Sequence, residues 1–264
     1  MPLPDAVITP PPAIQALLTL RPPGAMADEQ VAVEMPVALT VNEVSQAVML
    51  ATPADLEDFA LGFALSEGWI TSRRELLDVE VLTRPEGVEL ALRVTAAREQ
   101  HLKARRRLLA GRTGCGLCGL ESLAQLGAVQ PAPVKAPALA AGAMDRALAA
   151  LHAAQVLNAS CGGLHAAAWC RADGELRLAR EDVGRHNALD KLAGALNRSG
   201  EDAASGFVLM SSRASYELVH KTAMAGVGLL ACLSAPSSLA VETARQLGLQ
   251  LWAFVREGRA TRYA

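Results

Sequence analysis

Apolar and polar residues alternate along two stretches of the first half of the chain, which is typical of half-buried β-strands. Residues 30–51 follow this pattern, and Asn42-Glu43 interrupts it as a plausible turn. Residues 78–84 and 88–94 repeat the pattern on either side of a short turn that contains proline and glycine. The first half therefore predicts two β-hairpins.

A helix is expected between the two hairpins. Thr52 is a suitable N-cap, and Pro53 suits the first helical position. The helix should continue to Glu67 and stop at Gly68, since glycine readily ends a helix. A second, basic helix is expected near residues 96–110, after the second hairpin.

The second half alternates helices with short apolar strands, which indicates a layered α/β sheet with a parallel part. An antiparallel hairpin at its start makes the predicted sheet mixed. The expected elements are a helix near 143–157, strands 164–170 and 175–183, helix 186–198, strand 206–211, helix 215–226, strand 228–234, helix 237–247 and strand 249–255.

The chain has 264 residues, of which 51% are hydrophobic, so it can form one large or two modest domains. Proline-rich and alanine-rich stretches suggest the boundaries. We expect a flexible tail at 1–25, an N-terminal α+β domain at 26–112, a cysteine loop and linker at 113–142, and an α/β domain at 143–264.

The charge and the cysteine content exclude several classes of protein. The formal net charge of −2 gives no global basic field for nucleic acid. No apolar run is long enough to span a bilayer and no secretory signal is evident, so we expect a cytoplasmic protein without a membrane partner. Five cysteines, an odd number, argue against a structural disulfide framework and predict free thiols.

Cys115 and Cys118 form a CxxC pair within a glycine-rich stretch, 111–119, that follows the basic helix. Cationic groups such as Arg112 lower the pKa of a thiol and favour the nucleophilic thiolate. A second cysteine three positions away can resolve or share a reactive sulfur. The alternative is a zinc-binding structural or interaction module, but a closed zinc site needs four ligands and the chain has no second CxxC.

Three polar strand-to-helix turns form the other candidate sites. They lie at 181–191, 211–215 and 234–238, and the ends of parallel strands are where α/β sheets bind ligands. Together they predict a groove for a large phosphorylated ligand, while each alone can be ordinary helix capping. Cys161 and His165 lie near a fourth motif. His165 suggests a zinc deaminase, but Ala167 stands where the deaminase glutamate is needed, and a buried structural histidine is the simpler alternative.

Several motifs, taken in order, resemble the FdhD family of formate dehydrogenase accessory sulfurtransferases. The resemblance covers roughly residues 30 to 262. The motifs are DLEDFALGF at 55–63, RTGCGLCG at 112–119, GGLHAA at 162–167, EDVGRHNALDK at 181–191, SRASYE at 212–217 and SAPSSLA at 234–240.

The resemblance implies a sulfurtransferase. It accepts sulfur from a cysteine desulfurase and delivers it to molybdenum bis(molybdopterin guanine dinucleotide), a bound substrate that formate dehydrogenase needs. Cys115 would carry the persulfide and Cys118 would assist. The resemblance also implies a cytidine-deaminase-like C-terminal domain, a homodimer and no permanently bound metal. Cofactor binding, including its guanine nucleotide, is expected at Phe254, Val255, Arg256, Glu257, Gly258 and Arg259, with Arg185, His186, Arg213 and Ser237 in the turns.

Overall fold

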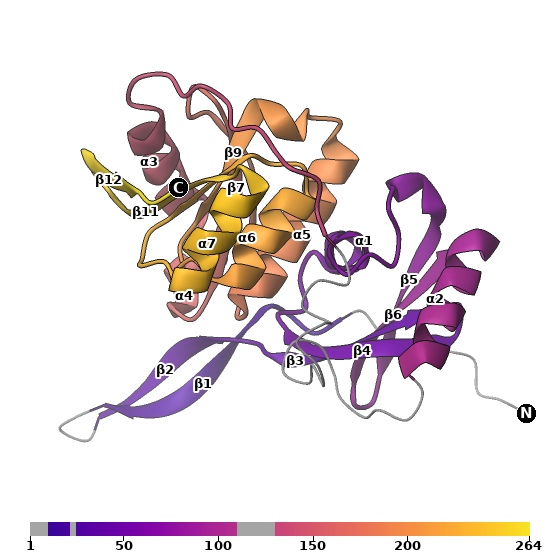
Figure 1. Ribbon diagram of the computed structural model, residues 1–264. Coiled ribbons are helices and arrows are strands. Elements are labelled where there is room, and N and C mark those ends of the chain that lie inside the picture. The colour runs from indigo at the N-terminus through magenta and orange to yellow at the C-terminus, as the bar shows by residue number, and fades with distance from the viewer. Residues whose placement is uncertain (1–9, 22–24, 110–129) are drawn as a thin grey trace, which may run out of the picture.

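The computed structural model describes residues 10–21, 25–109 and 130–264. They form a four-stranded sheet, a six-stranded sheet and a projecting two-stranded hairpin, with helices packed on and between the sheets (Figure 1). This architecture confirms a mixed α/β fold. Within these residues, no helix combines the length and the hydropathy that crossing a membrane requires.

The four-stranded sheet has the order β4-β3-β6-β5, with β3 and β6 parallel and the other neighbours antiparallel. Both predicted hairpins are confirmed. Asn42 and Glu43 have φ of 44° and 68°, so the first turn is built from two left-handed residues, which suits the twist of a hairpin. The strands are β3 (Met35–Val41), β4 (Val44–Ala51), β5 (Leu76–Arg84) and β6 (Gly87–Val94).

Helix α1 (Leu56–Ser66) packs on this sheet and ends as predicted, before Gly68 at φ 67°. Its predicted start is wrong. The N-cap is Asp55, and the Thr52 hydroxyl accepts instead from the distant Val183 N–H at 3.2 Å, while the Thr52 N–H donates to the Asp182 carboxylate at 3.0 Å. The helix starts late because Thr52 is held by a partner elsewhere in the chain. The remaining helices here are the short η1 (Arg73–Glu75) and the predicted basic helix α2 (Ala96–Leu109).

Strands β1 (Ile14–Arg21) and β2 (Ala25–Ala32) form a hairpin that projects from the body of the protein (Figure 1). The expected flexible tail at 1–25 is therefore wrong for residues 14–21. These residues pair with β2 in regular antiparallel register, which satisfies backbone hydrogen-bonding groups along the hairpin. At its base, β2 lies against helix α4 (Val156–Cys161).

The six-stranded sheet has the order β12-β11-β10-β9-β7-β8. Its β9, β10 and β11 are parallel and the other pairings are antiparallel, which confirms the predicted mixed sheet. The last strand of the sheet was not predicted. The strands are β7 (His165–Arg171), β8 (Leu176–Asp182), β9 (Gly206–Met210), β10 (Leu229–Cys232), β11 (Gln250–Arg256) and β12 (Arg259–Arg262).

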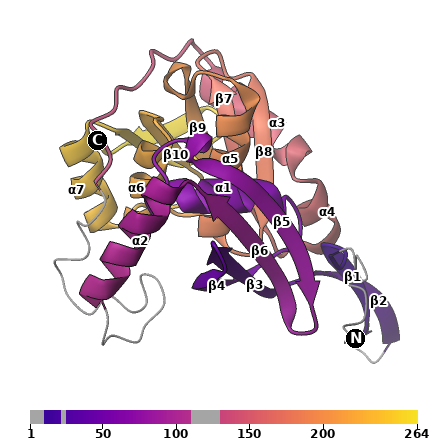
Figure 2. The same cartoon turned by 90° about the vertical axis from the view of Figure 1, so that its right-hand side faces the viewer.

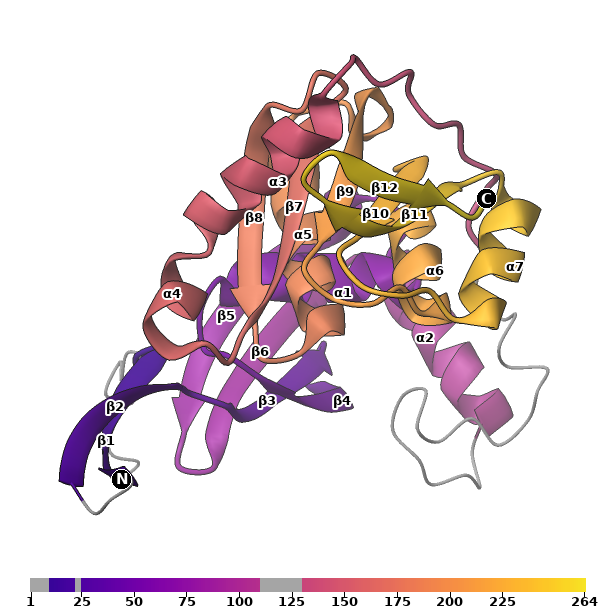
Figure 3. The same ribbon diagram turned by 90° about the vertical axis from the view of Figure 1, so that its left-hand side faces the viewer.

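Helices cover both faces of this sheet (Figures 1 and 3). Helix α3 packs on one face through Ala147 and Leu151, while α5, α6 and α7 pack on the other. The helix predicted at 143–157 is two helices, because the backbone turns at Gln155. The helices are α3 (Ala143–Ala154), α5 (Arg185–Ser199), the short η4 (Ala203–Ser205), α6 (Tyr216–Met224) and α7 (Ser238–Leu247).

Helices α1 and α5 join the two sheets by packing closely together (Figure 2). Glycines stand at their crossing. A Cβ atom added to Gly62 would lie 1.7 Å from the Asp190 carbonyl oxygen, and one added to Gly194 would lie 2.0 Å from the Asp58 carbonyl oxygen. Only glycine lets these two backbones approach so closely.

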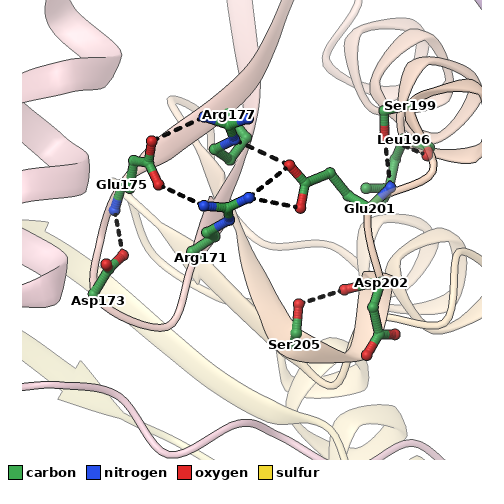
Figure 4. A network of polar contacts seen from close by, with 9 residues as sticks. All are labelled: Arg171, Asp173, Glu175, Arg177, Leu196, Ser199, Glu201, Asp202 and Ser205. Carbon is green, nitrogen blue, oxygen red and sulfur yellow. Dashed lines mark hydrogen bonds and ion pairs between the residues drawn. The ribbon is translucent and has the colours of Figure 1, made fainter.

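An ion-pair network on the surface ties the β7–β8 hairpin to the residues after α5 (Figure 4). Glu201 accepts hydrogen bonds from Arg171 at 3.1 Å and from Arg177 at 3.0 Å, and both arginines also pair with Glu175. The Arg177 hydrogen bond is the main reason that the pKa of Glu201 is lowered.

We expect the change Glu201→Gln to lower the melting temperature slightly at low ionic strength and not at about 1 M salt, because salt screens exposed charges. Thermal unfolding of both proteins at the two salt concentrations measures the effect. Glu86→Gln, at an exposed turn, serves as the control and should change nothing at either concentration. A large decrease in melting temperature that persists at about 1 M salt would show that the network is not an exposed, salt-screened one.

Candidate functional site

The candidate site lies along one edge of the six-stranded sheet. Parallel strands β9, β10 and β11 end at this edge, and helices α6 and α7 begin there. Antiparallel β8 also ends there, before α5 begins. The three polar turns predicted from the sequence therefore share one edge, as expected where parallel strands end.

Backbone hydrogen bonds hold the second and third turns side by side. The Ser234 N–H donates to the Ser212 carbonyl at 3.2 Å, and the Ala214 N–H donates to the Ala235 carbonyl at 3.1 Å. A parallel bridge also joins Ala214 to Pro236. The starts of α6 and α7 are thus fixed relative to each other.

The first turn meets the second through His186, at the start of α5. Its Nε2 atom lies 2.5 Å from a Glu217 carboxylate oxygen and 3.4 Å from the Ser215 hydroxyl. Both side chains of this contact are roughly three-quarters buried. The hydrogen bond from His186 is the main reason that the pKa of Glu217 is lowered, so Glu217 is ionised at neutral pH.

The start of β7 lies beside the first two turns. His165 pairs with Asp182 of the first turn, and the Ala166 N–H donates to the Ser211 hydroxyl of the second turn at 2.9 Å. Burial lowers the pKa of His165, and the nearby charges of Arg185 and His186 lower it further. Among the described residues, the buried Nε atom of Arg185 has no hydrogen-bond acceptor. Arg185 therefore supplies an unused buried donor at this edge.

The predicted cofactor-binding segment at the C-terminus reaches the edge with its first residues. The Phe254 N–H donates to the Ser234 carbonyl at 3.3 Å, and Arg256 donates to the Leu233 carbonyl. Phe254 has φ 52°, which is unusual outside glycine, and the residue is 38% exposed. Val255 points into the core and Glu257 is exposed.

Gly258 and Arg259 lie instead beside helix α3. The Gly258 N–H donates to the Asp145 carboxylate at 2.9 Å, and both residues line a cavity of about 480 Å³. Trp252, residues 137–140 and 142 of the linker, and the first turn of α3 form much of its wall. The C-terminal segment is thus divided between the edge and this cavity.

Most of the polar motif at 181–191 holds the structure together. Asp182 lies 2.6 Å from the buried Lys191 ammonium and accepts from the Thr52 and Gly184 N–H groups at 3.0 and 2.8 Å. Lys191 also donates to the Thr52 carbonyl. These contacts join the two sheets, so only Arg185 and His186 of this motif remain for a ligand at the edge.

The carboxylates of Glu181 and Asp190 also make structural contacts. The Glu181 carboxylate accepts from two N–H groups in the first turn of α4, at 2.8 and 2.9 Å. Asp190 accepts from Ser66 at 2.6 Å and pairs with Lys221 at 2.8 Å. Both carboxylates therefore lack free oxygens for chemistry.

Ser237 and Arg213 have different places at the edge. The Ser237 hydroxyl accepts from the Ala240 N–H at 3.3 Å, so it caps α7. Arg213 is exposed in the second turn, two residues before Ser215. Sequence reasoning missed the role of Glu217, because its pairing with His186 depends on the tertiary packing of α5 on α6.

The predicted persulfide residues Cys115 and Cys118 lie outside the described residues. Of the described cysteines, Cys170 and Cys232 are buried, which raises the pKa of Cys170 to about 12 and that of Cys232 further. The Cys161 thiol donates to the Leu157 carbonyl. Within the ranges that the structure describes, no three His, Cys, Asp or Glu side chains are placed to hold a metal ion.

Comparisons with known proteins agree on one family. A model described as the FdhD/NarQ family matches residues 32–264. A protein named sulfur carrier protein FdhD from Cupriavidus necator is 55% identical over 240 residues, which are 90% of this chain and 83% of the relative. Another of that name, from Variovorax paradoxus, is 57% identical over 226 residues, or 86% and 81% of the two chains.

A solved structure has the same fold. It is described as a putative formate dehydrogenase accessory protein from Desulfotalea psychrophila, and it superposes with a TM-score of 0.73 at 25% identity. The match covers 95% of both chains, so it includes both sheets.

Proposed function

This chain belongs to the FdhD/NarQ family, and we propose that it is a sulfurtransferase that matures the cofactor of a formate dehydrogenase. It takes sulfur from a cysteine desulfurase as a persulfide. It then transfers that sulfur to molybdenum bis(molybdopterin guanine dinucleotide), which it binds as a substrate. The names of the relatives, sulfur carrier proteins, support the transfer of sulfur itself.

The CxxC pair carries this proposal. The Cys115 thiolate attacks the terminal sulfur of the desulfurase persulfide, the old sulfur–sulfur bond breaks, and the desulfurase thiolate leaves. Cys118 assists or protects the new persulfide. The buried Cys170 and Cys232 are poor alternatives because their raised pKa values keep them protonated.

The polar edge is suited to the phosphates of the guanine dinucleotide. Arg185, Arg213 and Arg256 are at or near the three turns, and guanidinium groups pair well with phosphate oxygens. Phe254 is an exposed aromatic residue beside the third turn. Arg259 and the cavity beside α3 extend the same binding region, since they lie on the continuation of the C-terminal segment.

The other features implied by the resemblance remain part of the proposal. The protein acts in the cytoplasm as a homodimer, with formate dehydrogenase as the recipient of the finished cofactor. Its C-terminal domain adopts a cytidine-deaminase-like arrangement, and a mixed sheet between two helical layers supports that likeness.

Mass spectrometry after incubation with a cysteine desulfurase and cysteine tests the persulfide. We expect the wild-type protein to gain the mass of one sulfur atom, and the gain to be lost with reducing agent. The double variant Cys115→Ala/Cys118→Ala should gain nothing and should fail to support an active formate dehydrogenase. Cys161→Ala is the matched control and should behave as wild type.

A sulfur adduct that persists in the double variant would overturn this proposal. So would stoichiometric zinc that is retained by the wild-type protein and lost from the double variant, because a thiolate locked to zinc cannot carry sulfur.

A further inference from the structure

We propose that the cavity beside helix α3 binds the guanine base of the ligand and that Asp145 selects guanine over other bases. The inference rests on the proposed function for the class of ligand, a guanine nucleotide, and adds the residue that recognises the base. The cavity lies between α3 and the β11–β12 hairpin (Figure 3). Its volume of about 480 Å³ is within the range of roughly 300–1,000 Å³ that is typical of small-ligand pockets.

The carboxylate of Asp145 is held in a fixed orientation at the wall of this cavity. Asp145 lies in the first turn of α3, and its Oδ1 atom accepts from the Gly258 N–H at 2.9 Å. Both residues line the cavity. Among the residues that the structure describes, the Oδ2 atom has no hydrogen-bond or ion-pair partner. One oxygen therefore orients the side chain, and the other is free to accept from a ligand.

The hydrogen-bonding edge of guanine matches the groups in this wall. Guanine presents N1–H and N2–H donors beside its O6 acceptor, and a carboxylate can accept from both donors. The first turn of α3 also has N–H groups without a partner inside the helix, because the N-cap, Gly142, has no side chain to accept from them. Met144 and Asp145 of this turn line the cavity. The wall therefore combines an acceptor for the N1 and N2 hydrogens with donors for O6.

Other purines do not match this edge. Adenine has an N1 lone pair, which would face the Asp145 carboxylate, and an amine in place of O6. Hypoxanthine keeps N1–H and O6 but lacks the N2 amine, and xanthine has a C2 carbonyl in its place. A site that forms hydrogen bonds with its ligand rejects an analogue that leaves its polar groups unpaired or opposed. Asp145 should therefore favour guanine over all three.

Trp252 and Arg259 supply the remaining contacts of a nucleotide. Trp252, on β11, is half-buried and lines the cavity, so it provides an aromatic wall for a purine. Arg259 lines the same cavity and can pair with the attached diphosphate. The chain between Arg259 and Phe254 leads from this cavity to the polar edge. The base thus lies in the cavity, and its phosphates extend towards the edge.

Titration calorimetry of the full-length protein measures the base preference at neutral pH. The probes are guanosine, inosine, adenosine and xanthosine diphosphates, which share their ribose and phosphates and differ in the base. We expect guanosine diphosphate to bind about 10- to 100-fold more tightly than the adenosine and xanthosine compounds. Inosine diphosphate should lie between, because it loses only the contact of the N2 amine.

The variant Asp145→Asn should invert the preference between guanine and xanthine. Its amide oxygen can still accept from the Gly258 N–H, which places the NH₂ group where Oδ2 stands in the wild type. That group opposes the N2 amine of guanine but donates to the C2 carbonyl of xanthine. Asp173→Asn is the matched control, because Asp173 also accepts from a backbone N–H, that of Glu175 at 2.9 Å, and lies outside the cavity wall. It should keep the wild-type preference.

Tryptophan fluorescence locates the base in the wild-type protein, so it does not depend on the folding of Asp145→Asn. Trp69 and Trp169 are 6% and 0% exposed, whereas Trp252 lines the cavity. We expect guanosine diphosphate to change the fluorescence of the wild type and to leave that of Trp252→Phe unchanged.

The outcomes separate this inference from the proposed function. The inference is overturned by equal binding of all four nucleotides to the wild type, or by binding of guanosine diphosphate without a change in fluorescence. It is also overturned if folded Asp145→Asn keeps the preference for guanine or binds none of the four. Each of these results leaves a ligand site at the polar edge in place. Failure of the wild type to bind any of the four contradicts the proposed ligand itself.

Discussion

Replacing Gly62 with alanine is expected to push helices α1 and α5 apart and to lower the free energy of unfolding by about 3 kcal/mol. The added methyl group would lie 1.7 Å from the Asp190 carbonyl oxygen and 2.8 Å from the Gly194 nitrogen. Both obstacles are backbone atoms within α5, so no side chain can rotate to make room. In most helices the same change would stabilise the protein, because alanine favours the helix more than glycine does.

Chemical denaturation of the wild-type protein and Gly62→Ala measures the difference. Gly163→Ala is the matched control, since a methyl group there would meet only the Ala32 Cβ atom at an ordinary distance of 3.7 Å. It should have a small effect. Equal stability of Gly62→Ala and the wild type would show that the two helices are not packed as closely as described.

Replacing Asp182 with asparagine is expected to cost ~3–5 kcal/mol of stability at neutral pH, because it leaves the fully buried Lys191 ammonium without its counter-charge. Burial lowers the pKa of Lys191, and Asp182 opposes that shift. Without Asp182 the pKa falls further. The folded variant then binds fewer protons than the unfolded chain over a wider range of pH, so its stability rises with pH up to the unfolded pKa of lysine.

The loss measured by denaturation should therefore be smaller at about pH 9 than at about pH 6. The double variant Asp182→Asn/Lys191→Met should recover much of the lost stability, because it removes the unpaired charge. Asp78→Asn is the control: its ion pair with Arg93 is exposed, so we expect a loss below about 1 kcal/mol. A loss for Asp182→Asn that grows with pH would contradict the role given to Lys191.

Local patterns in the sequence were sufficient for most elements of the fold. The alternation around Asn42 and Glu43 predicted a hairpin because side-chain periodicity and turn conformation are decided by near neighbours. The start of α1 could not be predicted in this way. Thr52 is held by Asp182, which is 130 positions away, and that contact exists only after the two sheets have packed together.

In the candidate site, too, some features could be predicted from local sequence and others depend on distant contacts. Strand-to-helix turns can be recognised from the sequence, and their meeting at one edge follows from the parallel strands. The density of polar residues at 181–191 did not distinguish a ligand site from a structural one. The side chains of Asp182 and Lys191 make contacts that join the two sheets. Arg185 and His186 lie between them in the sequence, but their side chains lie at the edge where a ligand could bind.

The contacts between α1 and α5 mean that the two halves of this chain should not be produced separately. An isolated C-terminal half would keep Asp182 and Lys191 but lose the Thr52 backbone that both of them bind. It would also expose the small-residue surface around Gly194, against which α1 otherwise packs. Fragments cut between the sheets would therefore be prone to aggregation, and studies of either half need the intact protein.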